Sequence, residues 1–312
     1  MSQNNIPEYV VIGHITKDNT PTGPILGGTP SYAGLTAHQL GRRTAIVTSY
    51  GPDAPSLTAL NGIEMKVASA EQSTTFENIY VEGVRFQKWH ASATPLALEH
   101  VPPAWHNAPI IHLSPMGQEL SPGMCSHFPN SLVCVTIQGW LRGQDDDDNV
   151  IYQPHPDLDA SLGCIDILVM SLADVKGDRA AADYLLTSVK IGVETLGPQG
   201  CRVYHNGEVV HVPVQSEREV DPTGAGDIFA AAFFIHYRDT GDVIQAARFA
   251  NTCGALSVRQ VGIAGVPRLA EVETHLANIY ASHRGQRDRY PKQKLDGNTY
   301  RSAPYPVPGE CS

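Results

Sequence analysis

Short apolar runs alternate with longer amphipathic segments along most of the chain. The apolar runs are the length of buried parallel strands, and they occupy residues 9–12, 44–49, 109–113, 132–137, 165–170 and 191–194. The amphipathic segments predict helices at residues 28–40, 172–189, 224–237, 242–258 and 269–281. This alternation predicts an α/β fold with a doubly wound, mostly parallel central sheet and helices on both faces. Ligands of such sheets bind beyond the carboxyl ends of the strands.

Two further segments predict β-hairpins. Residues 75–90 have strand propensity on both sides of a Glu82-Gly83 turn, and residues 203–212 carry Asn206-Gly207, a strong signal for a tight turn. From Ser282 onward the chain is polar and rich in proline and glycine. We therefore expect a single folded domain over residues 1–282 and a loosely attached polar tail over residues 283–312.

The composition narrows the class of protein. The chain has 312 residues, of which 42% are hydrophobic and 17% charged, and its formal net charge is −10. An acidic chain without a run of lysine and arginine is a poor candidate for binding nucleic acid or an anionic membrane. The polar start lacks the basic and apolar regions of a secretory signal, and no apolar run is long enough to span a bilayer.

The six cysteines include no C-x-x-C pair, which favours reduced thiols in a cytoplasmic protein over disulfides or a zinc site. The acidic run at residues 145–148 invites a metal-binding interpretation. Consecutive carboxylates repel one another and point in different directions, so we interpret the run as a solvated loop.

The most informative segment is residues 221–227, Asp-Pro-Thr-Gly-Ala-Gly-Asp, which the apolar run IFAAAFF follows at once. Small residues leave backbone N–H groups uncovered, and the helix that starts here adds unpaired donors and the positive end of its dipole. Together they form an anion site suited to a phosphoryl group in transit. Asp227 lies in the first helical turn, where a carboxylate can accept a proton from an attacking hydroxyl.

The plain alternative is a helix cap in which Asp227 only stabilises the dipole; the complete heptapeptide and the small-residue helix behind it favour the catalytic interpretation. The chain has neither the G-x-x-x-x-G-K-[ST] sequence of P-loop enzymes nor the H-R-D and D-F-G motifs of protein kinases.

Residues 221–227 resemble the C-terminal signature of the PfkB carbohydrate kinases, the ribokinase-like family. Other segments agree, in the order of that family. Residues 11–18 with the pair Gly27-Gly28 resemble its first strand, substrate aspartate and glycine pair; residues 195–200 (TLGPQG) resemble its nucleotide-binding turn; residues 251–262 resemble the helix and loop beside the adenine. The resemblance covers roughly residues 9–280, and residues 138–142 (QGWLR) are similar to a branch that includes plant myo-inositol kinases.

The resemblance implies a role for each matching residue. Asp227 is the base, and the backbone N–H groups of Gly224, Ala225 and Gly226 form the anion hole. The acceptor's hydroxyls are held by Asp18, Gly27 and Gly28, with Tyr32 as a further substrate-binding candidate. ATP is contacted by Thr195, Gly197, Gly200, Asn251 and Gly262. Mg²⁺ bridges the phosphates, and dependence on a monovalent cation stays open.

The chain also departs from the family. Where the family has N-x-x-E near the hydrated Mg²⁺, this sequence has Ser171-Leu172-Ala173-Asp174, so Asp174 is the candidate metal ligand through water. The alternative, which does not exclude the first, is that Ser171 and Asp174 form a capping box. Because only residues 19–26 separate Asp18 from Gly27, we expect a small, reduced β lid built from about residues 14–27 and 73–92.

These observations predict ATP-dependent phosphorylation of a hydroxyl on a small sugar or cyclic polyol. A nucleoside kinase of the same fold stays open because the hairpin carries Phe76, Tyr80, Phe86 and Trp89, as does a non-catalytic ligand-binding regulator. A reduced lid favours a monomer or a weak dimer. The sequence does not identify the acceptor.

Overall fold

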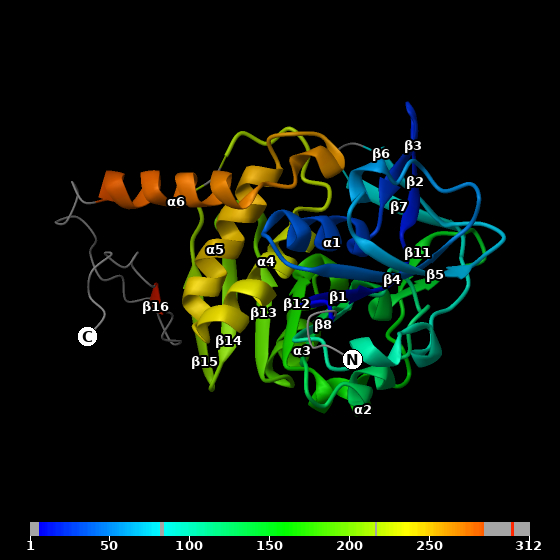
Figure 1. Ribbon diagram of the computed structural model, residues 1–312, viewed down its shortest axis with the longest axis horizontal. Helices are drawn as coiled ribbons and strands as arrows, with labels where there is room; N and C mark the ends of the chain where they lie inside the picture. Colours follow the sequence, from blue (N-terminus) through cyan, green and yellow to red (C-terminus); the bar gives the residue numbers. More distant parts are fainter. Residues whose placement is uncertain (1–5, 82–83, 216, 284–300, 303–312) are drawn as a thin grey trace.

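The computed structural model describes residues 6–81, 84–215, 217–283 and 301–302. A ten-stranded sheet runs through the molecule in the order β16-β15-β14-β13-β12-β9-β8-β1-β4-β5 (Figure 1). Its strands are β1 (Tyr9–Ile12), β4 (Thr44–Tyr50), β5 (Glu64–Ser69), β8 (Ile110–Leu113), β9 (Leu132–Thr136), β12 (Ile167–Ser171), β13 (Ile191–Thr195), β14 (Cys201–His205), β15 (Glu208–Val212) and β16 (Arg301–Ser302). The strands from β13 to β5 in this order are parallel, while β14 is antiparallel to both of its neighbours.

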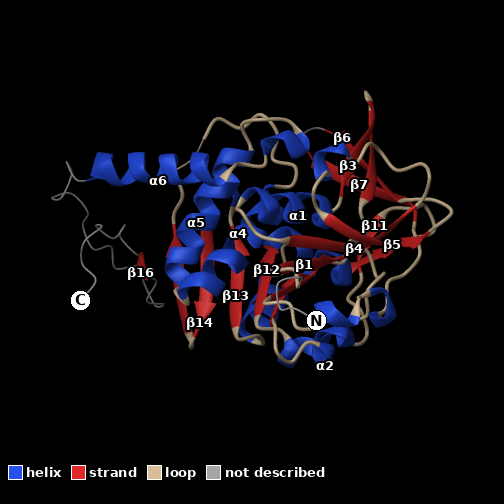
Figure 2. Cartoon of the chain, in the orientation of Figure 1, coloured by secondary structure: helices blue, strands red, loops and turns tan. Residues whose placement is uncertain are grey.

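Helices cover both faces of this sheet (Figure 2). The helices are α1 (Thr29–Gln39), α2 (Leu158–Ser161), α3 (Arg179–Thr187), α4 (Ala225–Thr240), α5 (Val243–Ser257) and α6 (Leu269–His283). Side chains of α1, α4, α5 and α6 share one buried apolar cluster, and those of α2 and α3 belong to the other. The predicted α/β architecture with a doubly wound, mostly parallel sheet is therefore confirmed.

The predicted helix over residues 172–189 is wrong in its first half. A 3-10 turn, η8 (Leu172–Val175), follows β12, and α3 begins only at Arg179. Lys176 and Gly177 have φ of 52° and 86°, which an α-helix does not accommodate. Asp178 then caps α3 by accepting a hydrogen bond from the amide of Ala181 at 3.1 Å.

The predicted hairpin over residues 203–212 is confirmed. Its two strands, β14 and β15, pair in antiparallel register from Cys201 to Val212. Asn206 and Gly207 both have positive φ, as the two-residue turn between twisted strands requires.

A second sheet, called the lid below, packs over the carboxyl ends of the central strands. It has four strands in the order β3-β2-β6-β7: β2 (Thr16–Thr20), β3 (Gly23–Gly27), β6 (Thr74–Val81) and β7 (Val84–Ala91). The strands β6 and β7 pair as the second predicted hairpin, whose turn at Glu82-Gly83 lies outside the described residues. The polar residues 16–20 form one of the lid strands and pair with β6.

The acidic run at residues 145–148 lies in a small hairpin, β10 (Arg142–Gln144) and β11 (Val150–Tyr152). This hairpin bridges to β7 through Asn149 and Lys88. Both oxygens of Asp145 accept hydrogen bonds within the turn. The Asp145 carboxylate therefore stabilises the turn itself, in agreement with the loop interpretation.

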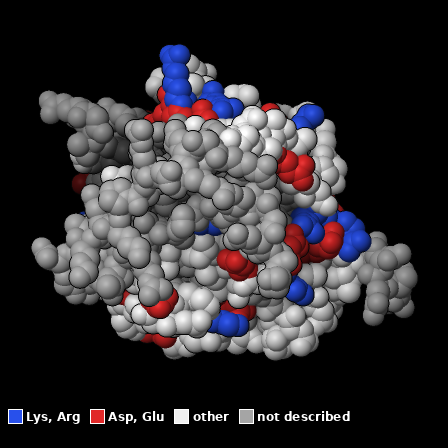
Figure 3. Space-filling view, turned by 90° about the vertical axis from the view of Figure 1, so that its left-hand side faces the viewer, with Lys and Arg blue, Asp and Glu red and all other residues white. Residues whose placement is uncertain are grey.

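Other sequence predictions can be compared with the described residues. The five cysteines among them are unpaired thiols, in agreement with the expected reduced state, and Cys311 lies outside the described residues. No helix in the described ranges is both long and apolar enough to cross a membrane. On the face shown in Figure 3, acidic and basic side chains of the described residues are interspersed. Of the predicted tail, Arg301 and Ser302 pair with Val210 and His211 of β15.

Candidate active site

Two neighbouring strands of the central sheet end at a cavity of about 320 Å³. Ser171 closes β12 and Thr195 closes β13, and both residues line this first cavity. Other lining residues are Gly197, Pro198, Gly200, Phe229, Asn251, Ala255 and Val258. Besides the strand ends and the glycines, Glu217, Glu219 and Asn251 are polar members of this wall, and much of the rest is apolar, as the flat faces of a nucleobase require.

The turn after β13 depends on glycine. Gly197 and Gly200 have φ of 56° and 91°. A Cβ at Gly200 would lie 2.2 Å from the carbonyl oxygen of Val212, so only glycine fits there. The amide of Leu196 donates to the Gly200 carbonyl at 2.8 Å and closes the turn. Backbone of this turn can therefore approach a ligand in the first cavity closely.

Asn251 lines the first cavity, and its side chain already has a structural task. The Asn251 Nδ2 donates to the Val212 carbonyl at 2.9 Å and so ties α5 to the end of β15. Gly262 lies outside the residues that line this cavity, and its amide donates to Asp221 Oδ2 at 2.8 Å. The structure thus brings Thr195, Gly197, Gly200 and Asn251 together but gives Gly262 a different neighbourhood.

Gly224, Ala225 and Gly226, named the catalytic turn below after the role expected from the sequence, lead into α4. Gly224 has φ of 77°, and Asp221 shapes the segment before it by accepting from the amide of Thr223 at 2.9 Å. Burial acts to raise the pKa of Asp221, but the hydrogen bonds from Thr223 and Gly262 outweigh it and lower that pKa. The Ala225 amide donates to the Pro222 carbonyl at 3.1 Å, so it already has a partner. Ala225 and Gly226 line the first cavity at the positive end of α4.

Asp227 lies in the first turn of α4, partly buried. Its Oδ1 accepts a hydrogen bond from the hydroxyl of Thr29 at 2.7 Å. Burial raises the pKa of Asp227 to about 6, and the neighbouring Asp174 and Asp18 add to this, while the Thr29 hydrogen bond and the charge of Arg142 act in the opposite direction. A carboxylate with this pKa is ionised near neutral pH and is a stronger base than an ordinary aspartate.

The acceptor-side candidates lie in the lid and at its junction with α1. Asp18 lies inside β2, and its Oδ1 accepts a hydrogen bond from the Thr16 hydroxyl at 2.8 Å. A Cβ at Gly27 would lie 2.5 Å from Asp18 Oδ2. Gly28 has φ of 88°, and a Cβ there would lie 2.4 Å from the His14 carbonyl oxygen. The glycine pair therefore lets the chain turn into α1 directly beside the Asp18 carboxylate.

Tyr32 lies on α1 and is 2% exposed. Its ring packs on the catalytic turn, because a Cβ at Gly224 would lie 2.2 Å from a ring carbon. The buried hydroxyl has no hydrogen-bond partner among the described residues. Burial, with Asp18, Asp227 and Asp221 nearby, raises the pKa of Tyr32 well above its usual value. The ring thus supports the backbone of Gly224 from the side of α1.

A second cavity, of about 810 Å³, opens between the lid, β10 and η8. Its wall includes Gln138, Arg142, Ser171 and Asp174, and Ser171 lines both cavities. The Ser171 amide and hydroxyl donate to Asp174 Oδ2 at 2.7 and 2.9 Å, which makes the expected capping box. Among the described residues no group of three or more metal-binding side chains occurs, so Asp174 stands without a cage of ligands.

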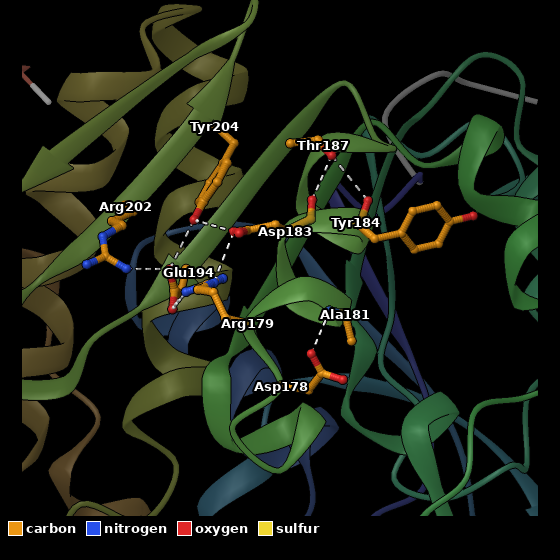
Figure 4. A network of polar contacts seen from close by, with 9 residues as sticks. All are labelled: Asp178, Arg179, Ala181, Asp183, Tyr184, Thr187, Glu194, Arg202 and Tyr204. Atoms are coloured by element: carbon orange, nitrogen blue, oxygen red, sulfur yellow. Dashed lines mark hydrogen bonds and ion pairs between the residues drawn. The ribbon is translucent and has the colours of Figure 1, made fainter. Parts of the chain in front are cut away.

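A polar network holds the end of β13 in place (Figure 4). Glu194 is 1% exposed, and its two oxygens accept from Arg179 at 2.7 Å and from Arg202 and Tyr204, both at 3.2 Å. These partners come from α3 and β14, the elements on either side of the strand. Since Thr195 is the next residue, the network fixes the strand end that borders the first cavity.

Thr29 and Arg142 were not predicted as site residues from the sequence. Arg142 is 9% exposed, donates to the Met116 carbonyl at 3.2 Å and lies with its guanidinium 5.5 Å from the centre of the Phe76 ring. Arg142 is the last residue of the QGWLR segment that the sequence singled out. The sequence could not show that it lies near Asp227, because that closeness depends on the packing of β10 under the lid. Thr29 could have been singled out only by its place directly after the glycine pair.

Comparisons with known proteins agree with this architecture. Residues 158–268 match the family described as pfkB family carbohydrate kinase. A putative sugar kinase of Pyrococcus horikoshii is 40% identical over 114 residues, 33% of this chain and 36% of that protein. A nucleoside kinase of Methanothermobacter thermautotrophicus is 23% identical over 259 residues, 76% of this chain and 79% of that protein. This chain thus spans about a third of the length of the sugar kinase that it matches.

Among solved structures, a pyrophosphate-dependent kinase in the ribokinase family, complexed with a pyrophosphate analogue and myo-inositol, superimposes with a TM-score of 0.71 at 19% identity. The superposition covers 85% of this chain and 99% of that one, which establishes a common fold. The family match lies over α3, the catalytic turn and α5, where the site residues concentrate. Residues 158–268 of this chain therefore match the PfkB family of carbohydrate kinases, and the chain has the ribokinase fold.

Proposed function

We propose that this protein transfers the γ-phosphoryl group of ATP to a hydroxyl of a small sugar or cyclic polyol, with Asp227 as the base. One observation carries the proposal. Asp227 lies directly after the catalytic turn, and Ser171 lines both the cavity on the donor side and the cavity under the lid. A phosphoryl group passing between these cavities would meet the N-terminus of α4 and the carboxylate together.

The first cavity fits a nucleotide donor better than a donor without a base. Phe229 is 5% exposed and lines the cavity with Ala255 and Val258, an apolar wall that has no use for pyrophosphate alone. The solved neighbour is named as pyrophosphate-dependent, so the donor is a point to test. Thr195 and the backbone of Gly197 and Gly200 border the polar end of the cavity, where phosphates would enter.

Mg²⁺, when bound with the nucleotide, would neutralise charge on the phosphates and on the transferred group. Asp174 is the described carboxylate that faces the second cavity from η8, beside Ser171. A single carboxylate fits a hydrated Mg²⁺ held mostly by phosphates and water.

On the acceptor side, the Asp18 carboxylate lies beside Gly27 of the glycine pair. A carboxylate accepts hydrogen bonds only, so Asp18 favours a ligand that offers adjacent hydroxyl donors. Because the Asp18 carboxylate lies directly against Gly27, the space beside it suits a compact ring. Sugars and inositols meet both conditions, and myo-inositol is the ligand named for the solved neighbour.

In the reaction, the acceptor oxygen attacks the γ-phosphorus while the bond from that phosphorus to the bridging oxygen of ADP breaks. The proton of the acceptor hydroxyl moves to Asp227, whose Oδ2 is not the oxygen that Thr29 binds. Backbone donors of the catalytic turn would stabilise charge on the phosphoryl oxygens. The buried guanidinium of Arg142 faces the same region and favours the ionised form of Asp227.

A nucleoside kinase is the second candidate, because a nucleoside kinase gives the longer of the two sequence alignments. The lid aromatics weaken this candidate. Phe76 is 1% exposed and packs against Trp89 with ring centres 5.6 Å apart, so these two rings hold the lid together. Phe86 is 54% exposed and borders the second cavity, where it could contact a base.

The test is steady-state kinetics on the purified protein with sugars, inositols and nucleosides, each with Mg·ATP and with Mg·pyrophosphate. We expect the highest kcat/KM for a free sugar or an inositol with ATP. If the highest kcat/KM belonged to a nucleoside, the proposed class of acceptor would be wrong. If turnover occurred only with pyrophosphate, the proposed donor would be wrong.

A further inference from the structure

The first residue of α1 contacts the proposed base across the domain. Thr29 and Asp227 are 198 residues apart in sequence, and their side chains meet at 2.7 Å with the Thr29 hydroxyl donating to Asp227 Oδ1. Thr29 is 2% exposed, so water does not compete freely for its hydroxyl. The contact joins the segment that follows the glycine pair to the segment that follows the catalytic turn.

The Thr29 hydroxyl is held in place before any ligand arrives. Gly28 fixes the entry of the backbone into α1, since a Cβ there would collide with the His14 carbonyl. The Thr29 amide is 3.2 Å from the Met116 sulfur, which anchors the residue from a second side. A β-branched side chain has few χ1 rotamers, so the hydroxyl direction follows from the backbone.

Charged and titratable groups surround Asp227 from every packed element. Asp174 of η8 and Asp18 of β2 raise its pKa, while Arg142 of β10 lowers it. The phenols of Tyr32 on α1 and Tyr9 on β1 are within electrostatic reach and are neutral near pH 7, because burial and neighbouring groups raise the pKa of each.

Behind Tyr9 lies His112 of β8, whose Nδ1 is 2.7 Å from the Tyr9 hydroxyl. Burial lowers the pKa of His112 to about 3, which keeps that ring neutral. Within this set of groups, Thr29 is the side chain that supplies a hydrogen bond to the carboxylate.

We propose that Thr29 is a positioning residue for Asp227: its hydroxyl holds Oδ1, leaves Oδ2 to face the acceptor, and favours the ionised carboxylate. The proposal rests on the function proposed above. In this proposal the start of α1 has two roles in the reaction step: its first residue orients the base, and the glycines just before it border the acceptor. Displacement of that helix start would disturb acceptor binding and proton acceptance together.

Thr29→Val tests this directly, since it keeps the shape and removes the hydroxyl, and Thr29→Ser is the matched control that keeps a donor. The Asp227 carboxyl is titrated by ¹³C NMR in each protein, with Asp227→Asn used to assign the signal. We expect Thr29→Val to raise the Asp227 pKa by about one unit, the usual size for loss of one hydrogen bond to a charged group. Thr29→Ser should stay within a few tenths of a unit of the wild type.

Activity provides a second readout. In Thr29→Val, kcat should fall about fivefold at pH 6 because the raised pKa leaves less of Asp227 ionised. Near pH 9 the carboxyl is ionised in both proteins, so any remaining loss of kcat reports a misplaced carboxylate. KM for ATP should not change, and the melting temperature checks that the variant is folded. Thr29→Ser should recover most of kcat.

The proposal is overturned if Thr29→Val titrates Asp227 at the wild-type pKa, or if Thr29→Ser is as impaired as Thr29→Val. Failure of the kinase function is a separate result: no acceptor would then be phosphorylated by any of the proteins. The NMR titration would still decide whether Thr29 favours the ionised form of Asp227.

Discussion

Replacing Asp227 by Asn should make the protein less active and, at neutral pH, more stable. Burial raises the pKa of this carboxyl from 3.8 to about 6 in the folded protein. A raised folded-state pKa means that the contribution of the carboxyl to stability is present at low pH and is lost as pH rises through about 6. The wild type therefore carries an energetic cost above pH 6 that an uncharged isostere avoids.

The size of this cost follows from the two pKa values. By proton linkage, the free energy of unfolding of the variant should exceed that of the wild type by about 0.5 kcal/mol at pH 4 and by about 3 kcal/mol above pH 7. The upper value is a maximum, because Asp227 is only partly buried and Asn brings its own amide into the site. A gain of about 2 kcal/mol would raise the melting temperature of a domain of this size by about 4–8 °C.

The assay is urea unfolding of the wild type and Asp227→Asn at several pH values between 4 and 8, with Asp145→Asn as control. Asp145 is a hairpin carboxylate whose hydrogen bonds from Asn149 lower its pKa, so its variant should show no such gain at neutral pH. A stability difference for Asp227→Asn that does not grow with pH would refute the reasoning about the site.

Four further outcomes follow from the structure. Asp18→Ala should lower kcat/KM for the preferred acceptor by about tenfold to a hundredfold, the usual loss for hydrogen bonds to a charged group, and an unchanged kcat/KM would contradict the proposed acceptor site. Glu194→Ala should destabilise the protein by about 2–4 kcal/mol in urea unfolding, since the arginines on either side of β13 lose their buried partner; a change below about 1 kcal/mol would show that the network is dispensable. Removing the residues after Arg284 should leave the melting temperature nearly unchanged, because that polar segment has little apolar surface to bury and its described part adds only the two-residue strand β16 beside β15; a drop of many degrees would contradict this. Light scattering should find no stable dimer joined through the lid, because Pro24 lacks a donor on the edge strand β3; a lid-mediated dimer would contradict this.

Much of the fold could be predicted because its strands are short buried apolar runs separated by amphipathic helices. The strands that were missed lack that pattern. Residues 16–20 read Thr-Lys-Asp-Asn-Thr, and they form a strand because β3 and β6 pair with them on both sides. The apolar and alanine-rich residues around Lys176 and Gly177 hid the break in the predicted helix. Gly177 is nevertheless a signal for the end of a helix, and Asp178 is a signal for the start of the next one.

The site residues likewise fall into those that the sequence could nominate and those that it could not. The glycine-rich segment before α4 and Asp227 are contiguous in sequence, so the sequence alone could nominate them together as the proposed anion site and base. Thr29 and Arg142 could not, since each reaches Asp227 only through tertiary packing of α1 and β10. Asn251 and Gly262 show a further limit, because a motif places both residues near a nucleotide while the fold assigns their polar groups to the backbone of Val212 and to Asp221.

Transfer of a phosphoryl group to a hydroxyl, with Asp227 as the base, is tested most directly by ³¹P NMR. The acceptor and ATP mixture is followed with the wild type and with Asp227→Asn at pH 7.5. We expect a phosphomonoester signal from the wild type, formed about two to four powers of ten more slowly by the variant, while both proteins bind ATP alike in calorimetry. Equal rates of phosphomonoester formation by the two proteins would contradict the assignment of the base, and ATP binding without transfer to any sugar, inositol or nucleoside would contradict the kinase function.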